Sequence, residues 1–191
     1  YLKDITHLDP VTKNIDLAPI LFSDKKSNAP HYCNTPSNDP WDKANLNQKM
    51  LKDLKPSISD SETAEFSYKI TNRDRSVGAQ VSGYIASLYG EAGCKQKQNI
   101  NFSGSAGQSF GAWNAAGLNL KLNGDANDYV GKGMNGGKIV ISSTGEYATK
   151  DSPAVLVGNT ALYGATGGEL YVGGLVGERF AVRNSGATAV I

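Results

Sequence analysis

The stretch that decides the fold is Val130-Gly-Lys-Gly-Met-Asn-Gly-Gly-Lys-Ile-Val-Ile141. A large apolar residue precedes a glycine, small residues and a second glycine follow, and alternating apolar residues close the stretch. The same order recurs in segments that begin at Val77, Phe110, Tyr163 and Phe180. Short strands that return at intervals of about 20 residues are typical of solenoids, and glycine supplies the positive φ that their corners need. The pattern predicts an all-β fold, a single-stranded parallel β-helix.

Two other arrangements of strands compete with this one. No strong amphipathic helix is evident after Ser76, which argues against alternating strands and helices. A β-sandwich or barrel stays open as an alternative, because Asn123-Gly124 is a dipeptide typical of tight hairpin turns.

Glycine and proline divide the chain near Ser76. All 22 glycines lie at Gly78 or later, and all but one of the seven prolines lie at or before Pro56. Residues 1–75 are therefore predicted to form an irregular lead-in, and residues 76–191 a glycine-rich β-helix domain. Within the lead-in we expect a helix over about 43–54 and a strand over about 65–71. Asp42 is the expected N-cap of that helix, and Pro56 is expected to follow its end.

Composition and charge exclude several classes of protein. The chain has 191 residues, 39% of them hydrophobic and 19% charged, which is typical of a globular protein. Its net charge is +1 without a clustered basic face, so we expect no nucleic-acid partner. No apolar run approaches the roughly 20 residues of a bilayer helix, and no secretion signal is evident. Cys33 and Cys94 show no recognisable spacing and favour two reduced thiols. These features predict a cytoplasmic protein with no membrane partner.

Motifs that resemble cofactor or metal sites are better explained as turns. The segment from Gly131 to Gly136 matches the dinucleotide fingerprint, but that motif requires a helix after it, and a strand is predicted here. The run Gly124-Asp-Ala-Asn-Asp128 lacks the glutamate that an EF-hand needs and is interpreted as a turn. His7 and His31 have no ligand-like neighbours. The sequence therefore predicts no catalytic, cofactor-binding or metal-binding residue.

Charged residues beside the glycine corners are candidates for a docking surface. Arg75, Arg179 and Arg183 fit either charge pairs between neighbouring coils or contacts with another domain, since guanidinium groups form directed bonds across interfaces. We favour the charge pairs and keep the interdomain contacts as a possible role of these three residues.

Several segments resemble the C-terminal, GXGXG domain of the glutamate synthase large subunit. They are Asp74-Arg-Ser-Val-Gly-Ala79, Gly107-Gln-Ser-Phe-Gly111, Gly124-Asp-Ala-Asn-Asp-Tyr-Val-Gly-Lys-Gly133, Asn159-Thr-Ala-Leu-Tyr-Gly-Ala-Thr-Gly-Gly168 and Gly177-Glu-Arg-Phe-Ala-Val-Arg-Asn-Ser-Gly186. The resemblance covers most of residues 76–191 and extends more weakly into the lead-in. A subunit of formylmethanofuran dehydrogenase carries a similar glycine-rich domain and is the runner-up.

The resemblance implies a right-handed β-helix that packs against catalytic domains. It implies a parent oxidoreductase that makes two glutamates from glutamine and 2-oxoglutarate, with an amidotransferase domain and a domain holding FMN and an iron–sulfur cluster. A flavoprotein small subunit that supplies electrons from NADPH is implied as a partner. The family's catalytic cysteine is a first residue, whereas Tyr1 stands here, and the two cysteines of this chain cannot hold the family's cluster. The resemblance therefore implies that the amidotransferase site, FMN and the cluster lie outside this chain.

Two alternative functions come from other classes. An independent β-helix enzyme acting on polysaccharides would use Asp125, Asp128, Lys132 and Lys138 as its charged cluster. A stand-alone interaction module would self-associate through an open coil end near Ile191, where the solenoid is expected to be truncated.

Overall fold

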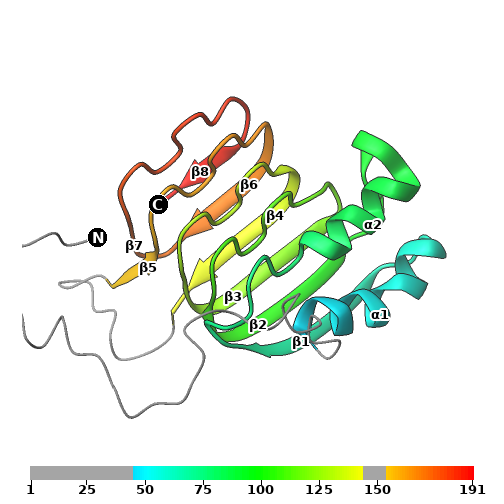
Figure 1. Ribbon diagram of the computed structural model, residues 1–191. Helices are drawn as coiled ribbons and strands as arrows, with labels where there is room; N and C mark the ends of the chain where they lie inside the picture. The colour runs from blue at the N-terminus through cyan, green and yellow to red at the C-terminus, as the bar shows by residue number, and fades with distance from the viewer. Residues whose placement is uncertain (1–44, 144–153) are drawn as a thin grey trace, which may run out of the picture. The chain divides into compact units, whose positions relative to one another are not determined.

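A parallel sheet forms the centre of the structure. The computed structural model describes residues 45–143 and 154–191 (Figure 1); the predictions for Asp42, His7, His31 and Cys33 fall outside these residues. Eight strands of the described part make one sheet, and every pairing in it is parallel. The strands are β1 (Ala64–Ile70), β2 (Gln98–Ala106), β3 (Leu118–Ala126), β4 (Asn135–Ser142), β5 (Val155–Val157), β6 (Gly167–Val172), β7 (Leu175–Val176) and β8 (Thr188–Val190). Their order is β1-β2-β3-β4-β6-β8, and β5 pairs with both β3 and β7.

Helix α1 (Leu46–Ser59) precedes β1 and begins at an Asn45 cap. The Asn45 side chain accepts a hydrogen bond from the backbone N–H of Gln48, which satisfies a donor of the first turn. Its apolar residues recur at helical spacing, and the buried ones are Met50, Leu54 and Ile58. The helix continues through Pro56, beyond the predicted end, and the Pro56 carbonyl accepts from the N–H of Asp60 at 2.9 Å. Burial of the Ile58 side chain explains the extra turn, because it offsets the hydrogen bond that proline cannot donate.

Helix α2 (Ala79–Tyr89) overturns the predicted fold class. Together with the short 3-10 helix η2 (Gly90–Ala92) it connects β1 to β2, where the sequence predicted a strand after Gly83. The predicted all-β right-handed single-stranded parallel β-helix is therefore wrong: the protein is α/β, with helices interleaved with the strands of a parallel sheet. Val81 and Ile85 explain the helix, because a spacing of four places both on one buried face.

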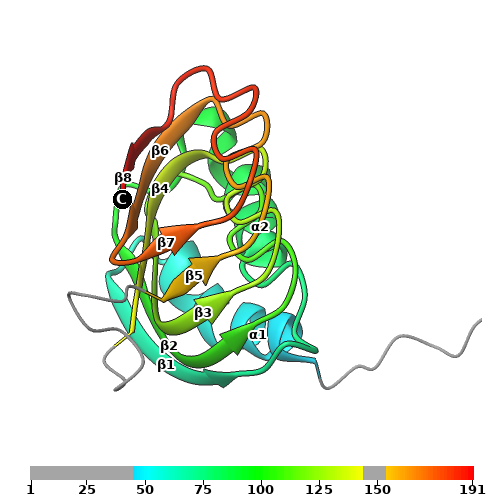
Figure 2. The same ribbon diagram turned by 90° about the vertical axis from the view of Figure 1, so that its left-hand side faces the viewer.

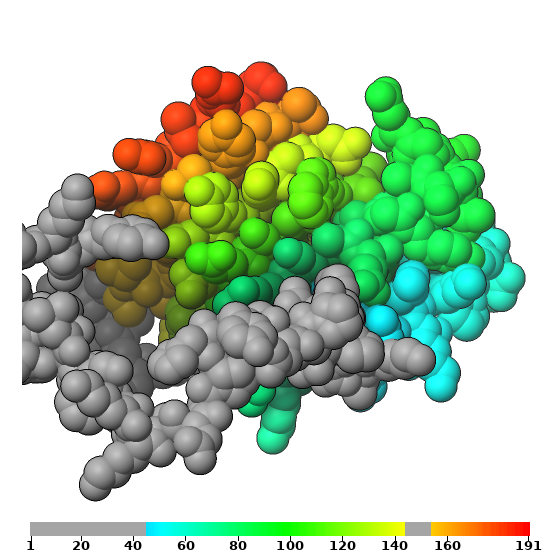
Figure 3. Space-filling view, viewed as in Figure 1, coloured from blue at the N-terminus to red at the C-terminus, as the bar shows by residue number. Residues whose placement is uncertain are grey.

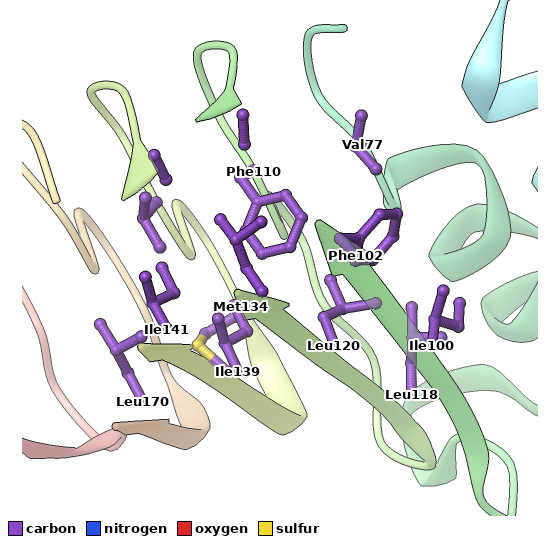
Figure 4. Packing of buried hydrophobic residues seen from close by; sticks show 14 of the residues in the cluster. Val77, Ile100, Phe102, Phe110, Leu118, Leu120, Met134, Ile139, Ile141 and Leu170 are labelled. Carbon is purple, nitrogen blue, oxygen red and sulfur yellow. The ribbon is translucent and has the colours of Figure 1, made fainter. Parts of the chain in front are cut away.

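Aligned apolar rows hold the sheet to the rest of the core. Parallel register places side chains of like kind opposite one another in neighbouring strands. The two rows are Ile100, Leu120, Ile139 and Leu170, and Phe102, Leu122, Ile141 and Val172. Figure 4 shows many of these residues packed on the same side of the strands. The Phe110 ring meets the Phe102 ring edge to face, with centroids 5.3 Å apart, a geometry that adds to the burial of both rings.

The sandwich or barrel alternative also fails within the described residues. Asn123 and Gly124 lie inside β3, paired with Ser103 and Gly104 of β2, and form no hairpin. A side chain at Gly124 would collide with the Gly104 carbonyl, so this glycine permits close approach of two strands.

A series of similar turns lies on the side away from the sheet, and we call it the turn stack. Its members are Ser76–Gly78, Ser109–Trp113, Tyr129–Gly133, Thr160–Gly164 and Arg179–Arg183. In each, the first, third and, where present, fifth residues have the positive φ of left-handed backbone, and the residues between them do not. Figure 2 shows the turns lying over one another.

Backbone hydrogen bonds tie each turn of the stack to its neighbours. The N–H of Tyr129 donates to the carbonyl of Asn159, the residue just before the following turn, at 2.9 Å, and the N–H of Gly131 donates back to Phe110 at 2.9 Å. The N–H of Gly133 donates forward again, to Tyr163 at 2.9 Å. These bonds over-determine a backbone that would otherwise be costly for residues other than glycine.

Candidate interaction surface

The turn stack forms a shallow groove across three successive turns. We call it the turn groove; it has a volume of about 500 Å³ and is lined by Tyr129, Lys132, Thr160, Tyr163, Arg179 and Val182. The first and fourth residues of these three turns make up the lining. The second residues Val130 and Ala161, in contrast, are fully buried in the core. The second residues therefore belong to the core, whereas the first and fourth residues line the surface.

The charged atoms of the turn groove are positive. The Lys132 ammonium lies over the Tyr129 ring, 5.5 Å from its centroid, as a cation–π pair. Arg179 is exposed on the same surface. The groove lining contains no carboxylate. The one salt bridge found within residues 45–143 and 154–191 joins Lys138 to Glu169 at 2.9 Å. Neither of these residues lines the turn groove.

The three predicted contact arginines occupy the two ends of the turn stack. Arg179 and Arg183 lie in the last turn, both exposed and both with positive φ, at 55° and 57°. Arg75 is exposed beside the first turn, and its carbonyl accepts a hydrogen bond from Asn47 at 2.9 Å. The structure thus brings two of the arginines together and keeps the third apart. Their role as interdomain contacts stays a prediction.

The apparent dinucleotide motif from Gly131 to Gly136 lies in the third turn and runs into β4. A strand follows where the nucleotide motif needs a helix N-terminus, as predicted. The nearest atoms to an added Cβ at Gly133 belong to the Trp113 ring, 3.0 Å away, so this glycine makes room for an indole.

The charged cluster suggested for a carbohydrate-active enzyme is dispersed. Lys138 pairs with Asn119 near the start of β3, whereas Asp125 lies near the end of that strand. Asp125 accepts from the Ser105 hydroxyl at 2.7 Å, and Asp128 accepts from the backbone N–H of Asn159 at 2.8 Å. These carboxylates hold backbone and side chains in place and do not converge with Lys132 on one point.

A second hollow, of about 540 Å³, lies between α2 and the turns (Figure 3). Small residues form most of its lining, and Trp113 closes one side with 56% of its surface exposed. The Ser82 hydroxyl at this hollow is buried and has no hydrogen-bond partner among the described residues.

Sequence reasoning missed the aromatic residues of this surface. Trp113, Tyr129 and Tyr163 stand at the fifth, first and fourth positions of their turns. Each of them stands at a short distance along the sequence from a turn glycine. Once the alternating backbone is known, that distance predicts that these side chains lie on the surface.

Metal ligands do not gather in the described part of the chain. No group of three or more His, Cys, Asp or Glu side chains could hold a metal ion there. Cys94 is a free, buried thiol, so these residues do not offer the cysteine set that an iron–sulfur cluster requires. None of the helices in residues 45–143 and 154–191 is long and apolar enough to cross a membrane.

The fold described above defines a parallel-sheet domain with glycine-rich turns. Residues 45–191 match the GXGXG motif family, and the chain belongs to it. Over 139 residues, or 73% of this chain, it is 52% identical to ferredoxin-dependent glutamate synthase 2 of Synechocystis sp.. It is 58% identical over 124 residues, or 65% of the chain, to the ferredoxin-dependent glutamate synthase of Pyropia yezoensis. The chloroplastic enzyme of Oryza sativa subsp. japonica is 48% identical over 139 residues, again 73% of the chain.

The match covers a small part of each relative. The aligned residues span 9% of the Synechocystis and Oryza proteins and 8% of the Pyropia protein. The resemblance to the C-terminal GXGXG domain of the glutamate synthase large chain is confirmed.

Proposed function

We propose that this chain is a structural part of a ferredoxin-dependent glutamate synthase and has no catalytic role by itself. The observation that carries the proposal is identity of about half of the aligned residues to relatives of that name. The parent enzyme would make two glutamates from glutamine and 2-oxoglutarate. Its amidotransferase domain, FMN and iron–sulfur cluster would lie outside residues 1–191.

Ferredoxin replaces NADPH as the proposed electron donor. The resemblance implied NADPH and a flavoprotein small subunit, but the relatives named above are all ferredoxin-dependent by name. The same relatives favour glutamate synthase over the formylmethanofuran dehydrogenase alternative. A cytoplasmic location is kept as a proposal for this chain, although the Oryza relative is named chloroplastic.

The packing of polar side chains supports a structural role. Gln98 is fully buried, accepts from the Ser57 hydroxyl at 2.8 Å and donates to the Glu62 carbonyl at 2.6 Å, which joins α1 to the sheet. Asn114 is equally buried and donates to the carbonyls of Leu118 and Gly136. Buried side-chain amides that donate hydrogen bonds to backbone carbonyls stabilise and rigidify a scaffold.

A segment exchange tests the proposal. The matching segment of the Synechocystis enzyme would be replaced by residues 45–191 of this chain, and glutamate formation would be measured with reduced ferredoxin and with NADPH. We expect ferredoxin-dependent activity close to that of the parent enzyme and no gain with NADPH. A folded but inactive chimera, or one driven by NADPH, would contradict the proposal.

Two controls complete this experiment. The same chimera carrying Phe110→Ala should lose activity as the domain unfolds, since removal of a buried phenylalanine costs about 3–5 kcal/mol. The 191-residue chain by itself should neither hydrolyse glutamine nor bind FMN, and turnover of glutamine by it would overturn the structural role.

A further inference from the structure

The turn groove has the composition of a binding surface rather than of a solvated turn. Tyrosine and arginine are enriched among the residues that dominate binding energies at protein interfaces. Here Tyr129, Tyr163 and Arg179 meet in one depression, and Tyr129 and Val182 are each 37% exposed.

The backbone beneath the groove is costly for the residues it carries. Thr160 has a φ of 60° and Arg179 a φ of 55°. A left-handed conformation is unfavourable for any residue with a Cβ and most of all for a β-branched one. Glycine would adopt the left-handed conformation at a lower free-energy cost at either position, so the fold itself does not require a side chain on this surface.

Unpaired positive charge indicates the chemistry of the occupant. The described residues place no carboxylate within salt-bridge distance of Lys132 or Arg179. The nearest acidic neighbour of Lys132 along the chain, Asp128, already accepts a hydrogen bond from the Asn159 backbone. Two cations in one depression attract negative charge, and the exposed Tyr129 ring adds an apolar surface beside them.

The spacing of the turns beneath the groove fits an extended chain. Neighbouring turns are joined by backbone hydrogen bonds of 2.8 to 2.9 Å, from Tyr129 to Asn159 and from Thr160 to Glu178. Repeats joined in this way lie about 5 Å apart, and a short extended peptide crosses three of them. We propose that the turn groove binds an acidic peptide segment of a partner protein, with carboxylates at Lys132 and Arg179 and an apolar side chain against Val182. This proposal rests on the surface alone and is independent of the proposed function.

Peptide binding to the full 191-residue chain tests the proposal. The probe is a short fluorescein-labelled peptide in which glutamate alternates with leucine, and the matched control has glutamine in place of glutamate. Fluorescence anisotropy should show binding of the glutamate peptide that weakens as salt is raised, because screening shortens the reach of exposed charges. The glutamine peptide should bind at least about tenfold more weakly.

Charge removal locates the site. Lys132→Gln combined with Arg179→Asn should weaken binding of the glutamate peptide by about tenfold or more. Asparagine suits position 179 because it tolerates the left-handed backbone better than other side chains. Lys121→Gln removes an exposed cation of β3 outside the groove and should leave binding unchanged.

Three results would overturn the proposal. They are absence of binding by the glutamate peptide, equal binding by the double variant with an unchanged circular dichroism spectrum, and a preference for duplex DNA or for anionic lipid vesicles over the glutamate peptide. If the double variant unfolds, Val182→Glu provides the deciding measurement: this exposed change should repel the peptide, and unchanged binding would refute the site.

Discussion

The side-chain oxygen of Asn47 accepts a hydrogen bond from the backbone N–H of Gly78, 3.1 Å away. The amide nitrogen of the same side chain donates to the carbonyl of Arg75 at 2.9 Å. Asn47 is 6% exposed on α1, and Gly78 is the N-cap of α2 with a φ of 96°. One amide of the first helix therefore holds the loop that leads into the second.

Asn47→Ala should destabilise the chain by about 1–3 kcal/mol, because it leaves the buried Gly78 N–H without a partner. Urea unfolding followed by circular dichroism measures the change. Lys52→Ala, an exposed change on the same helix, should stay within about 0.5 kcal/mol of the parent. Equal stability of the two variants would show that the Asn47 amide does not hold the loop.

Gly83→Ala should raise the free energy of unfolding by about 0.5–1 kcal/mol. Gly83 lies inside α2, and an added Cβ there meets nothing within 4 Å, so alanine gains helix propensity without a clash. Gly124→Ala is the matched control and should lower the free energy of unfolding, because its Cβ would collide with the Gly104 carbonyl of β2. Thermal unfolding of both variants checks the signs, and destabilisation by Gly83→Ala would count against the helix.

The stability of the chain should depend on Tyr68 at alkaline pH. Burial first, and then the hydrogen bond to Asp53 at 2.9 Å, raises the pKa of the Tyr68 hydroxyl above its ordinary value. A tyrosine in the unfolded chain loses its proton at a pH of about 10, but Tyr68 in the folded chain keeps its proton to higher pH. The stabilisation by this hydroxyl is therefore fully present below pH about 10 and is lost as pH rises through the folded pKa.

Tyr68→Phe should thus cost about 1–2 kcal/mol at neutral pH, since it removes a hydrogen bond to a carboxylate. The difference in unfolding free energy between this variant and the parent should shrink as pH rises above about 10. Urea unfolding at a series of pH values measures it. A difference that stays constant to high pH would exclude a raised pKa for Tyr68.

The Lys138–Glu169 pair should be visible by titration and contribute little to stability. The hydrogen bond from Lys138 lowers the pKa of the Glu169 carboxyl, and the Tyr171 hydroxyl also donates to Glu169. Any stabilisation by this carboxylate is present above its unfolded pKa and is lost as pH falls through the lower folded one. Lys138→Met should move the Glu169 pKa upward by NMR titration, with little change in the melting temperature, because exposed pairs are worth little. An unmoved pKa would show that the pair does not persist in solution.

Much of the sheet could be predicted from the glycine pattern. The apolar alternation after Gly117, Gly137 and Gly168 became β3, β4 and β6. The same pattern after Gly83 misled, because Val81 and Ile85 are spaced for a helix and the glycine between them resembles a corner. Glycine is compatible with both structures, and only packing of the two apolar side chains against α1 and the sheet decides between them.

The candidate surface was predicted less completely than the sheet. Arg179 could be named because a charge beside a glycine corner is evident in the sequence. The groove around it could not, because left-handed backbone at Thr160 and Leu162 contradicts the local preference of both residues. Hydrogen bonds from neighbouring turns impose that conformation, and such long-range constraints leave no mark in a short stretch of sequence.

The sign of φ alternates along each turn, so the backbone of a turn has a period of two residues. From Tyr129 to Gly133, left-handed positions fall at every second residue, and buried Val130 stands between two of them. Loss or gain of a single residue would exchange the two classes, and residues that now lack positive φ would have to adopt the left-handed conformation. Natural variation in the length of these turns should therefore come in pairs of residues, or else fall in the connections beyond them.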